Sequence, residues 1–202
     1  MKLELWYPLD KFVISQKFGL NADYYGRNYR QAGHAGWDMV GGYGQICRAA
    51  HDGVVVFSGY DGSAGLGIVI RTLQPFDYDG GNFYFKTIFW HLKDGSILVK
   101  PGDKVEAGQA IAQCNGTGIL IGIDGFNLGT KESVSHLHFG LKPIQQGENE
   151  WTWANVEQTN GYFGAIDPEP YWNGKYARVV PEARSLIARL TAFIASLKGR
   201  SS

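Results

Sequence analysis

Two histidines alternate with apolar residues in the segment His136-Leu137-His138-Phe139. Because successive side chains of a β-strand point to opposite faces, His136 and His138 would share one face, and Leu137 and Phe139 the other. Two imidazoles on one face can bind a metal ion or move a proton at a single site. Taken alone, the pair has a simpler explanation as two surface histidines on a half-exposed strand, so the choice depends on the rest of the sequence.

Another histidine lies four positions before a carboxylate in the segment GHAGWD, which contains His34 and Asp38. The glycines argue against a helix here, and an extended turn can aim both side chains at one point. A neutral imidazole and a carboxylate are both ligands of zinc. On its own this spacing is a weak signal, because Asp38 could instead cap a turn.

Combined with one histidine of the pair at 136 and 138, His34 and Asp38 complete a set of three protein ligands. Three ligands leave one position of a zinc ion open for water, as in catalytic rather than structural sites. The other histidine of the pair would face this position, and His91, in the segment FWHL, could approach it from an adjacent strand. Two imidazoles beside a zinc-bound water can relay its proton and stabilise an oxyanion formed at a carbonyl. The chain contains no H-E-x-x-H motif, so a histidine has to act as the base.

Four other side chains have ordinary explanations. His51 follows no ligand spacing and precedes a strand, so we expect a solvated surface histidine. Tyr29 could donate its phenol to an oxyanion, but we expect a packed aromatic residue. Cys47 and Cys114 are too few for a disulfide framework and lack C-x-x-C spacing, so we expect two buried thiols.

The composition excludes several classes of partner. The 202 residues contain 19 Lys and Arg and 19 Asp and Glu, so no net charge attracts nucleic acid. No apolar stretch reaches the length of a transmembrane helix, and we expect no membrane insertion. One hydrophobic core is feasible at this length, and we place a single domain in residues 1–176.

The segment from Gly53 to Phe139 is dominated by short β-branched and aromatic runs that Gly-rich or Asp-Gly turns separate. This pattern predicts a mainly β fold in which an antiparallel β-sheet forms a barrel or roll. Beyond Pro143, the sequence predicts an aromatic-rich, loop-like region that extends to Tyr176.

A helical pattern begins at Pro181 and ends at Gly199. Its apolar residues fall on one stripe, as in an amphipathic helix. These residues are Leu186, Ile187, Leu190, Phe193, Ile194 and Leu197. The sequence therefore predicts a C-terminal α-helix within residues 177–202, which either packs on the domain or docks to a virion component or another partner.

Several segments together resemble the lysostaphin-type zinc metalloendopeptidase family, whose members cut peptide bonds in bacterial peptidoglycan. The resemblance covers roughly residues 18–171 and keeps the family's order. The segments are HAGWD (34–38), AAHDGVVVFSGYDGSAGLGIVI (49–70), FWHL (89–92), ILVKPGDKVEAGQAIAQCNGTG (97–118) and HLHF (136–139). The resemblance implies a β fold built on a duplicated hybrid motif, with peptidoglycan peptides as the substrate.

The resemblance also assigns roles that the spacing alone leaves open. It implies one zinc ion per chain, bound by His34, Asp38 and His138. It further implies that His91 and His136 are catalytic and act on the water and on the tetrahedral intermediate. The commoner target among members of the family is a bond involving D-alanine in a directly cross-linked wall, and we expect that target here.

Two segments depart from the family pattern: an insertion at residues 119–135 and a long connection at Gln74–Asn82. We expect both to wall the groove around the metal and to alter its subsites. All five metal and catalytic positions are filled, which argues against a non-catalytic wall-binding or activator module. The segment VKPGDKVEAGQAIA also resembles half of a biotinyl or lipoyl carrier domain, but neither methionine lies beside a lysine in such a hairpin.

The N-terminal segment MKLELWYPLDKFVISQKFG lacks the continuous apolar run of a secretory signal. Since the implied substrate lies outside the bacterial membrane, we expect a phage or prophage enzyme that is released as a lysin or carried on the virion. The alternative is a secreted or anchored bacterial wall-remodelling endopeptidase whose signal has been removed. In both cases the enzyme acts in the bacterial cell wall.

Overall fold

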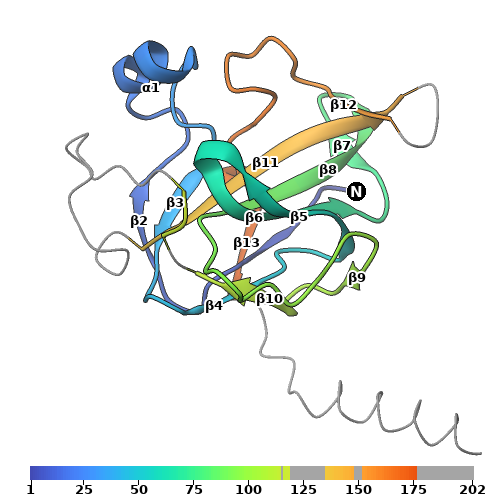
Figure 1. The fold of residues 1–202 in the computed structure, drawn as a ribbon. Coiled ribbons are helices and arrows are strands. Elements are labelled where there is room, and N and C mark those ends of the chain that lie inside the picture. Colours follow the sequence, from blue (N-terminus) through green and yellow to red (C-terminus); the bar gives the residue numbers. More distant parts are fainter. Residues whose placement is uncertain (115, 119–134, 148–151, 177–202) are drawn as a thin grey trace, which may run out of the picture.

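The structure, a computed structural model, is mainly β (Figure 1). It describes residues 1–114, 116–118, 135–147 and 152–176. The strands are β1 (Leu5–Tyr7), β2 (Val13–Gln16), β3 (Trp37–Val40), β4 (Ile46–Arg48), β5 (Gly53–Asp61), β6 (Gly65–Thr72), β7 (Phe76–Tyr78), β8 (Gly81–Trp90), β9 (Lys104–Val105), β10 (Ala110–Gln113), β11 (Leu137–Gln146), β12 (Trp153–Asn155) and β13 (Trp172–Tyr176). The helical elements are the α-helix α1 (Ala22–Tyr29) and the short 3₁₀ helices η1 (Gly62–Ala64) and η2 (Glu169–Tyr171).

One antiparallel sheet contains most of the strands. Its order is β2-β3-β11-β8-β6-β5-β9, with β12 beside β11 and β7 beside β8. A small antiparallel sheet of β4 and β10 and a parallel pair of β1 and β13 complete the fold. The predicted mainly β, antiparallel fold is confirmed. Among the described residues the large sheet runs as an open path from β2 to β9, so it forms a roll rather than a closed barrel.

The hydrophobic core lies against one face of this sheet. Phe85 and Phe89 of β8 and Leu137 and Phe139 of β11 are fully buried, and the rings of Phe89 and Phe139 lie 5.3 Å apart. Because alternate side chains of a strand point to opposite faces, burial of these residues turns His138 to the other face. The two-residue period of the segment HLHF therefore determines which face of the sheet His138 points to.

The region between Pro143 and Tyr176 contains more regular structure than the sequence predicts. β12 pairs with the end of β11, and β13 pairs with β1. The Trp172 ring lies 4.9 Å from the Phe139 ring and 5.7 Å from the Trp37 ring. The loop-like prediction is wrong here, because aromatic side chains in short segments are held against the large sheet by tertiary packing that no local pattern reveals.

The connection Gln74–Asn82 is a β-hairpin rather than a loop. Phe76 pairs with Phe83 and Tyr78 with Gly81, so β7 folds back on the start of β8. The end of β8, where His91 follows, is separated from this hairpin by about 30 Å of extended chain. The expectation that this segment walls the groove around the histidines is therefore wrong.

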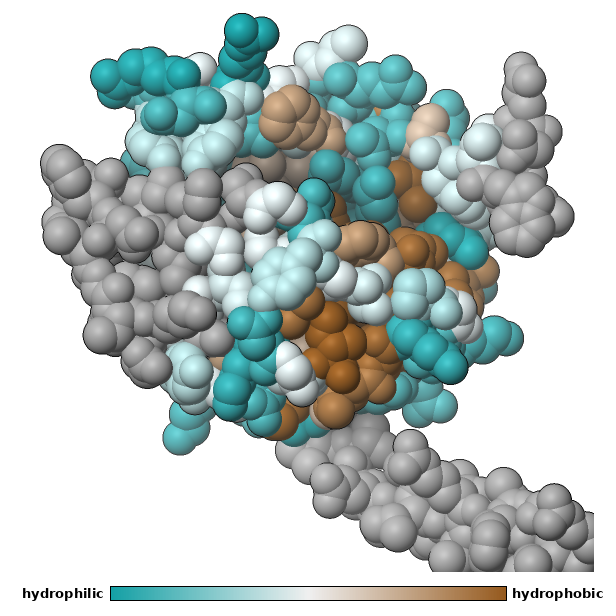
Figure 2. Space-filling view, in the orientation of Figure 1, coloured by the Kyte–Doolittle hydropathy of each residue, from teal (hydrophilic) through white to brown (hydrophobic). Residues whose placement is uncertain are grey.

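Some of the segments for which the sequence makes predictions are described by the structure and others are not. Residues 119–134 of the insertion and the predicted C-terminal helix lie outside the described residues. Cys47 and Cys114 are buried and free, as expected. Within the described part of the chain, no helix combines the length and the apolar character needed to cross a membrane. Figure 2 shows hydrophobic residues gathered in the lower part of one face of the molecule.

His51 is buried, with only 5% of its surface exposed, so the expectation of a solvated histidine is wrong. The Asp52 carbonyl lies 2.9 Å from Nδ1 and can only accept, so Nδ1 carries the hydrogen and Nε2 accepts from the Thr87 hydroxyl, also at 2.9 Å. Burial lowers the pKa of His51, and the neighbouring Asp52 offsets only part of this effect. Thr87 comes from β8, 36 positions along the chain, which explains why the local sequence does not reveal the bond.

This buried histidine gives the fold a specific response to acid. The folded pKa of His51 is lower than the unfolded value of about 6.5, so below that pH the unfolded chain takes up a proton that the folded chain does not. We expect the free energy of unfolding of the wild type to fall with decreasing pH, by up to about 1.4 kcal/mol per pH unit more than that of His51→Gln. Chemical denaturation between pH 8 and pH 5 measures the difference.

Thr87→Val provides the matched control. It removes the hydroxyl that His51 accepts from but leaves the imidazole in place, so it should lower stability at every pH and keep the wild-type slope. Equal pH slopes for the wild type and His51→Gln would contradict this account of the histidine.

Candidate metal centre

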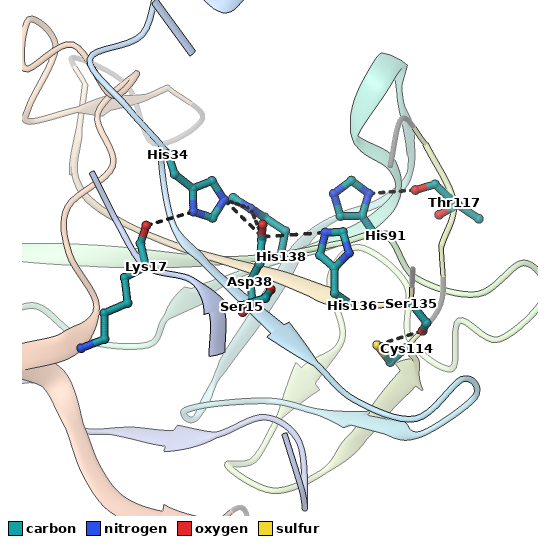
Figure 3. Close-up of polar contacts among 10 residues, drawn as sticks. All are labelled: Ser15, Lys17, His34, Asp38, His91, Cys114, Thr117, Ser135, His136 and His138. Atoms are coloured by element: carbon teal, nitrogen blue, oxygen red, sulfur yellow. Dashed lines mark hydrogen bonds and ion pairs between the residues drawn. The ribbon is translucent and has the colours of Figure 1, made fainter. Parts of the chain in front are cut away.

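Three ligand atoms meet where β3 and β11 pair (Figure 3). Asp38 of β3 lies directly opposite His138 of β11 in the strand register. His34 precedes β3 and is held by backbone hydrogen bonds to Gly19 and Leu20. Nε2 of His34 lies 2.9 Å from Nδ1 of His138 and 3.1 Å from Oδ1 of Asp38, and the last two atoms are 3.0 Å apart.

This arrangement fits a zinc ion in both chemistry and spacing. Two imidazole nitrogens and one carboxylate oxygen are ligands that zinc accepts. Bonds of about 2.0–2.2 Å in a tetrahedral site require ligand atoms that are about 3–3.5 Å apart, close to the separations observed here. His34 is 2% exposed and Asp38 9%, so the carboxylate is largely removed from water. A largely buried carboxylate with two imidazole nitrogens at contact distance is an environment that a divalent cation stabilises.

Two features outside the three ligands fix their orientation. Nδ1 of His34 lies 3.3 Å from the Lys17 carbonyl, which can only accept a hydrogen bond and thus leaves Nε2 with its lone pair toward the site. A Cβ at Gly36 would lie 2.9 Å from the His138 ring and 2.4 Å from the Phe139 carbonyl oxygen, so only glycine fits there. From the sequence this glycine is only a helix breaker, and its contact with His138 exists because β3 and β11 are paired.

The electrostatics of Asp38 are set by its histidine neighbours. Burial opposes the ionised form, but the imidazoles of His34 and His138 at hydrogen-bond distance hold the pKa of Asp38 well below its usual value. Oδ1 of Asp38 is also 3.8 Å from Nε2 of His136. The carboxylate is therefore ionised throughout the neutral pH range.

His91 and His136 form the other side of the site, with ring centroids 4.7 Å apart. Nδ1 of His91 donates to the Thr117 carbonyl at 2.8 Å, which leaves Nε2 as a hydrogen-bond acceptor. Burial, together with the charges of His136 and His138, lowers the pKa of His91 to about 3. His91 is therefore neutral at physiological pH. The structure thus brings all five sequence-predicted site residues into one cluster.

Thr117 is a supporting residue that the sequence analysis missed. Besides accepting from His91, it accepts a hydrogen bond from the Leu66 amide through its hydroxyl, at 3.0 Å, and donates the same hydroxyl to the Leu92 carbonyl, at 2.6 Å. The side chain is 4% exposed. These bonds join β6 to the residues that follow β8 and hold the His91 ring in place. Nothing in the local segment CNGTG distinguishes this threonine from an ordinary turn residue.

The helix α1 places a tyrosine cluster beside His34. The Tyr25 ring lies 5.4 Å from the His34 ring. Tyr29 packs against Tyr24 and Tyr25, with centroids 6.0 and 5.8 Å apart, which agrees with the expected packed aromatic residue. The helix itself was not predicted, because Gly26 and three tyrosines are poor helix formers. Tyr25, rather than Tyr29, is the aromatic residue that borders the metal-binding cluster.

Comparisons with known proteins identify relatives of this chain. The sequence profile of peptidase family M23 matches residues 32–150, more than half of the chain and the whole of the described metal-binding cluster. Solved structures with a similar fold include LytU, with a TM-score of 0.51 and 23% identity over 80% of this chain and 84% of LytU.

Two other similar structures have comparable scores. A zinc-containing peptidase from Vibrio cholerae has a TM-score of 0.52 and 25% identity over 83% of this chain, which spans only 41% of that peptidase. The catalytic domain of EnpA, a prophage-encoded M23 protein from Enterococcus faecalis, has a TM-score of 0.52 and 17% identity over 82% of this chain and 95% of that domain. At these identities, LytU and EnpA support the fold alone.

Proposed function

Because the chain belongs to peptidase family M23, we propose that it is a zinc metalloendopeptidase that hydrolyses peptide bonds of bacterial peptidoglycan. The observation that carries this proposal is the triangle of ligand atoms from His34, Asp38 and His138, with sides of 2.9–3.1 Å. Two further histidines lie beside this triangle. A binding module has no use for such a cluster, whereas a hydrolase requires it.

His34, Asp38 and His138 would hold the zinc ion, which when bound supplies Lewis-acid polarisation of water and of the substrate carbonyl. Nδ1 of His91 donates its hydrogen to the Thr117 carbonyl, so Nε2 is the atom that would take the proton of the attacking water. His136 lies next to it and would donate an N–H group to the carbonyl oxygen as negative charge develops there.

The rival functions receive less support. A biotinyl or lipoyl carrier domain gives no reason for four histidines and an aspartate in one cluster. A non-catalytic activator has no need for His91 with a free Nε2 beside the metal ligands. The phage or prophage setting and the bacterial setting both place the enzyme in the cell wall, on the side of the membrane where peptidoglycan lies.

Digestion of purified peptidoglycan tests the proposed function. We expect release of soluble peptide fragments from directly cross-linked wall, with cleavage at a bond involving D-alanine, as judged by mass spectrometry. A chelator should abolish release and added zinc should restore it. Full activity in chelator would overturn the metal mechanism, and release of glycine-terminated fragments alone would overturn the choice of bond.

Two alanine variants test the division of labour within the HLH segment. His138→Ala removes a ligand atom and should abolish stoichiometric zinc binding, as measured by elemental analysis. His136→Ala should keep the zinc and lower turnover by about 10²–10⁴-fold, because it removes a group that acts on the reacting atoms. Equal loss of zinc from both variants would show that the roles are not divided in this way.

A further inference from the structure

Three basic residues lie directly opposite one another on three neighbouring strands. In the register of the sheet, Lys142 of β11 pairs with Lys86 of β8, and Lys86 pairs with Arg71 of β6. Neighbouring strands are about 4.8 Å apart, and like charges directly opposite one another are destabilising. We call Arg71, Lys86 and Lys142 the cationic row. A nearby anion would offset the repulsion between these like charges.

The cationic row is on the same face of the sheet as the candidate metal centre. The next residues along the strands, Ile70, Thr87 and Leu141, are fully buried in the core, so the basic side chains point the other way. His138 shares that face and lies four positions before Lys142 on β11. Four residues of strand span about 13 Å. β6, β8 and β11 run side by side between the two sites (Figure 1).

The part of the chain that the structure describes supplies no carboxylate to this row. Within the described residues, no ion pair involves any of its three members. Lys142 donates to the backbone carbonyl of Phe163 at 2.7 Å, and Arg71 donates through Nη1 to the carbonyl of Thr72 at 3.3 Å. The Nε atom of Arg71 is buried without a hydrogen-bond partner. Basic groups with neutral partners and an unused donor are suited to receive an anion.

Neighbouring aromatic rings and burial strengthen this case. The Arg71 guanidinium lies 4.2 Å from the centroid of the Trp153 ring and 5.4 Å from that of Tyr84, so its plane is held in position. Burial lowers the pKa of Lys86, and burial together with the charge of Lys86 lowers the pKa of Lys142 to about 8. Lys142 is therefore still mostly charged at neutral pH, and both lysines lie in surroundings that disfavour the charge.

We propose that the cationic row is a substrate subsite that binds a free carboxylate of the wall peptide about 13 Å from the metal centre. This inference rests on the proposed function and adds a recognition element to it. Stem peptides of peptidoglycan carry carboxylates on side branches, and an extended peptide reaches this distance within about four residues. A guanidinium beside two ammonium groups can bind a carboxylate through charge-assisted hydrogen bonds. The row would therefore select peptides with a free carboxylate over amidated ones.

A binding experiment tests the row independently of catalysis. The probes are two soluble stem peptides that lack a scissile cross-link and differ only in amidation of their side-branch carboxylates. We expect calorimetric titration of the wild type to show about tenfold or weaker binding of the amidated peptide. Lys142→Met and Lys86→Met keep the apolar stem but remove a charge, and they should lose most of this discrimination. Lys100→Met, which changes an exposed lysine in the turn before β9, should retain it.

Kinetics with cross-linked versions of the same peptides separate this proposal from the proposed function. The row variants should raise KM for the carboxylate peptide by about tenfold and leave kcat nearly unchanged, because the row lies far from the reacting atoms. Hydrolysis of both peptides with equal KM by the wild type would overturn the subsite but keep the function. Discrimination in the titration without any hydrolysis would overturn the function but keep the subsite. Equal binding of both peptides by the wild type overturns the subsite without reference to any variant.

Discussion

The pairing of Asp38 with His138 across β3 and β11 is the constraint on which the rest of the site depends. These residues are 100 positions apart, and a single register brings their side chains to the same point on the sheet. The core enforces that register, because Trp37, Met39, Leu137 and Phe139 flank the pair on both strands and are buried on the opposite face. A slip of either strand by one residue would bury its ligand side chain and expose the two large apolar residues that flank it.

The same sheet organises the surroundings of this pair in two directions. Toward the strand ends, Thr117 ties β6 to the residues after β8 and thereby fixes the ring of His91. Along β11, the alternation that presents His138 also presents Lys142. The candidate metal centre and the proposed cationic row therefore lie on one face, and the hydrophobic core on the other face keeps both in position.

The sequence predicts part of this structure for a clear physical reason. A two-residue period determines which side chains of HLHF face the core, so the direction of both histidines follows from local sequence. The mainly β fold follows in the same way from short β-branched and aromatic runs. The roles assigned to His34, Asp38, His91, His136 and His138 came from the family resemblance, and the structure adds that these residues are neighbours in space.

The predictions that failed depend on contacts between distant segments. The burial of His51 needs Thr87 from another strand, and the packing of Trp172 needs the core of the large sheet. The contact of Gly36 with His138 likewise exists only once β3 and β11 are paired. The hairpin at Phe76 is the exception, because its Asp79-Gly80 turn is a local hairpin signal. Apart from the hairpin turn, none of these contacts has a signature in its own segment. The strand register that aligns the three residues of the cationic row likewise cannot be read from any single segment.

The central claim is that His34, Asp38 and His138 together form one zinc site. Anomalous X-ray scattering from a crystal of the purified protein, recorded on both sides of the zinc absorption edge, tests this claim most directly. We expect one strong zinc peak per chain within bonding distance of Nε2 of His34, Oδ1 of Asp38 and Nδ1 of His138. A peak bound by His91 and His136 instead, or the absence of any peak between β3 and β11 from zinc-saturated protein, would contradict it.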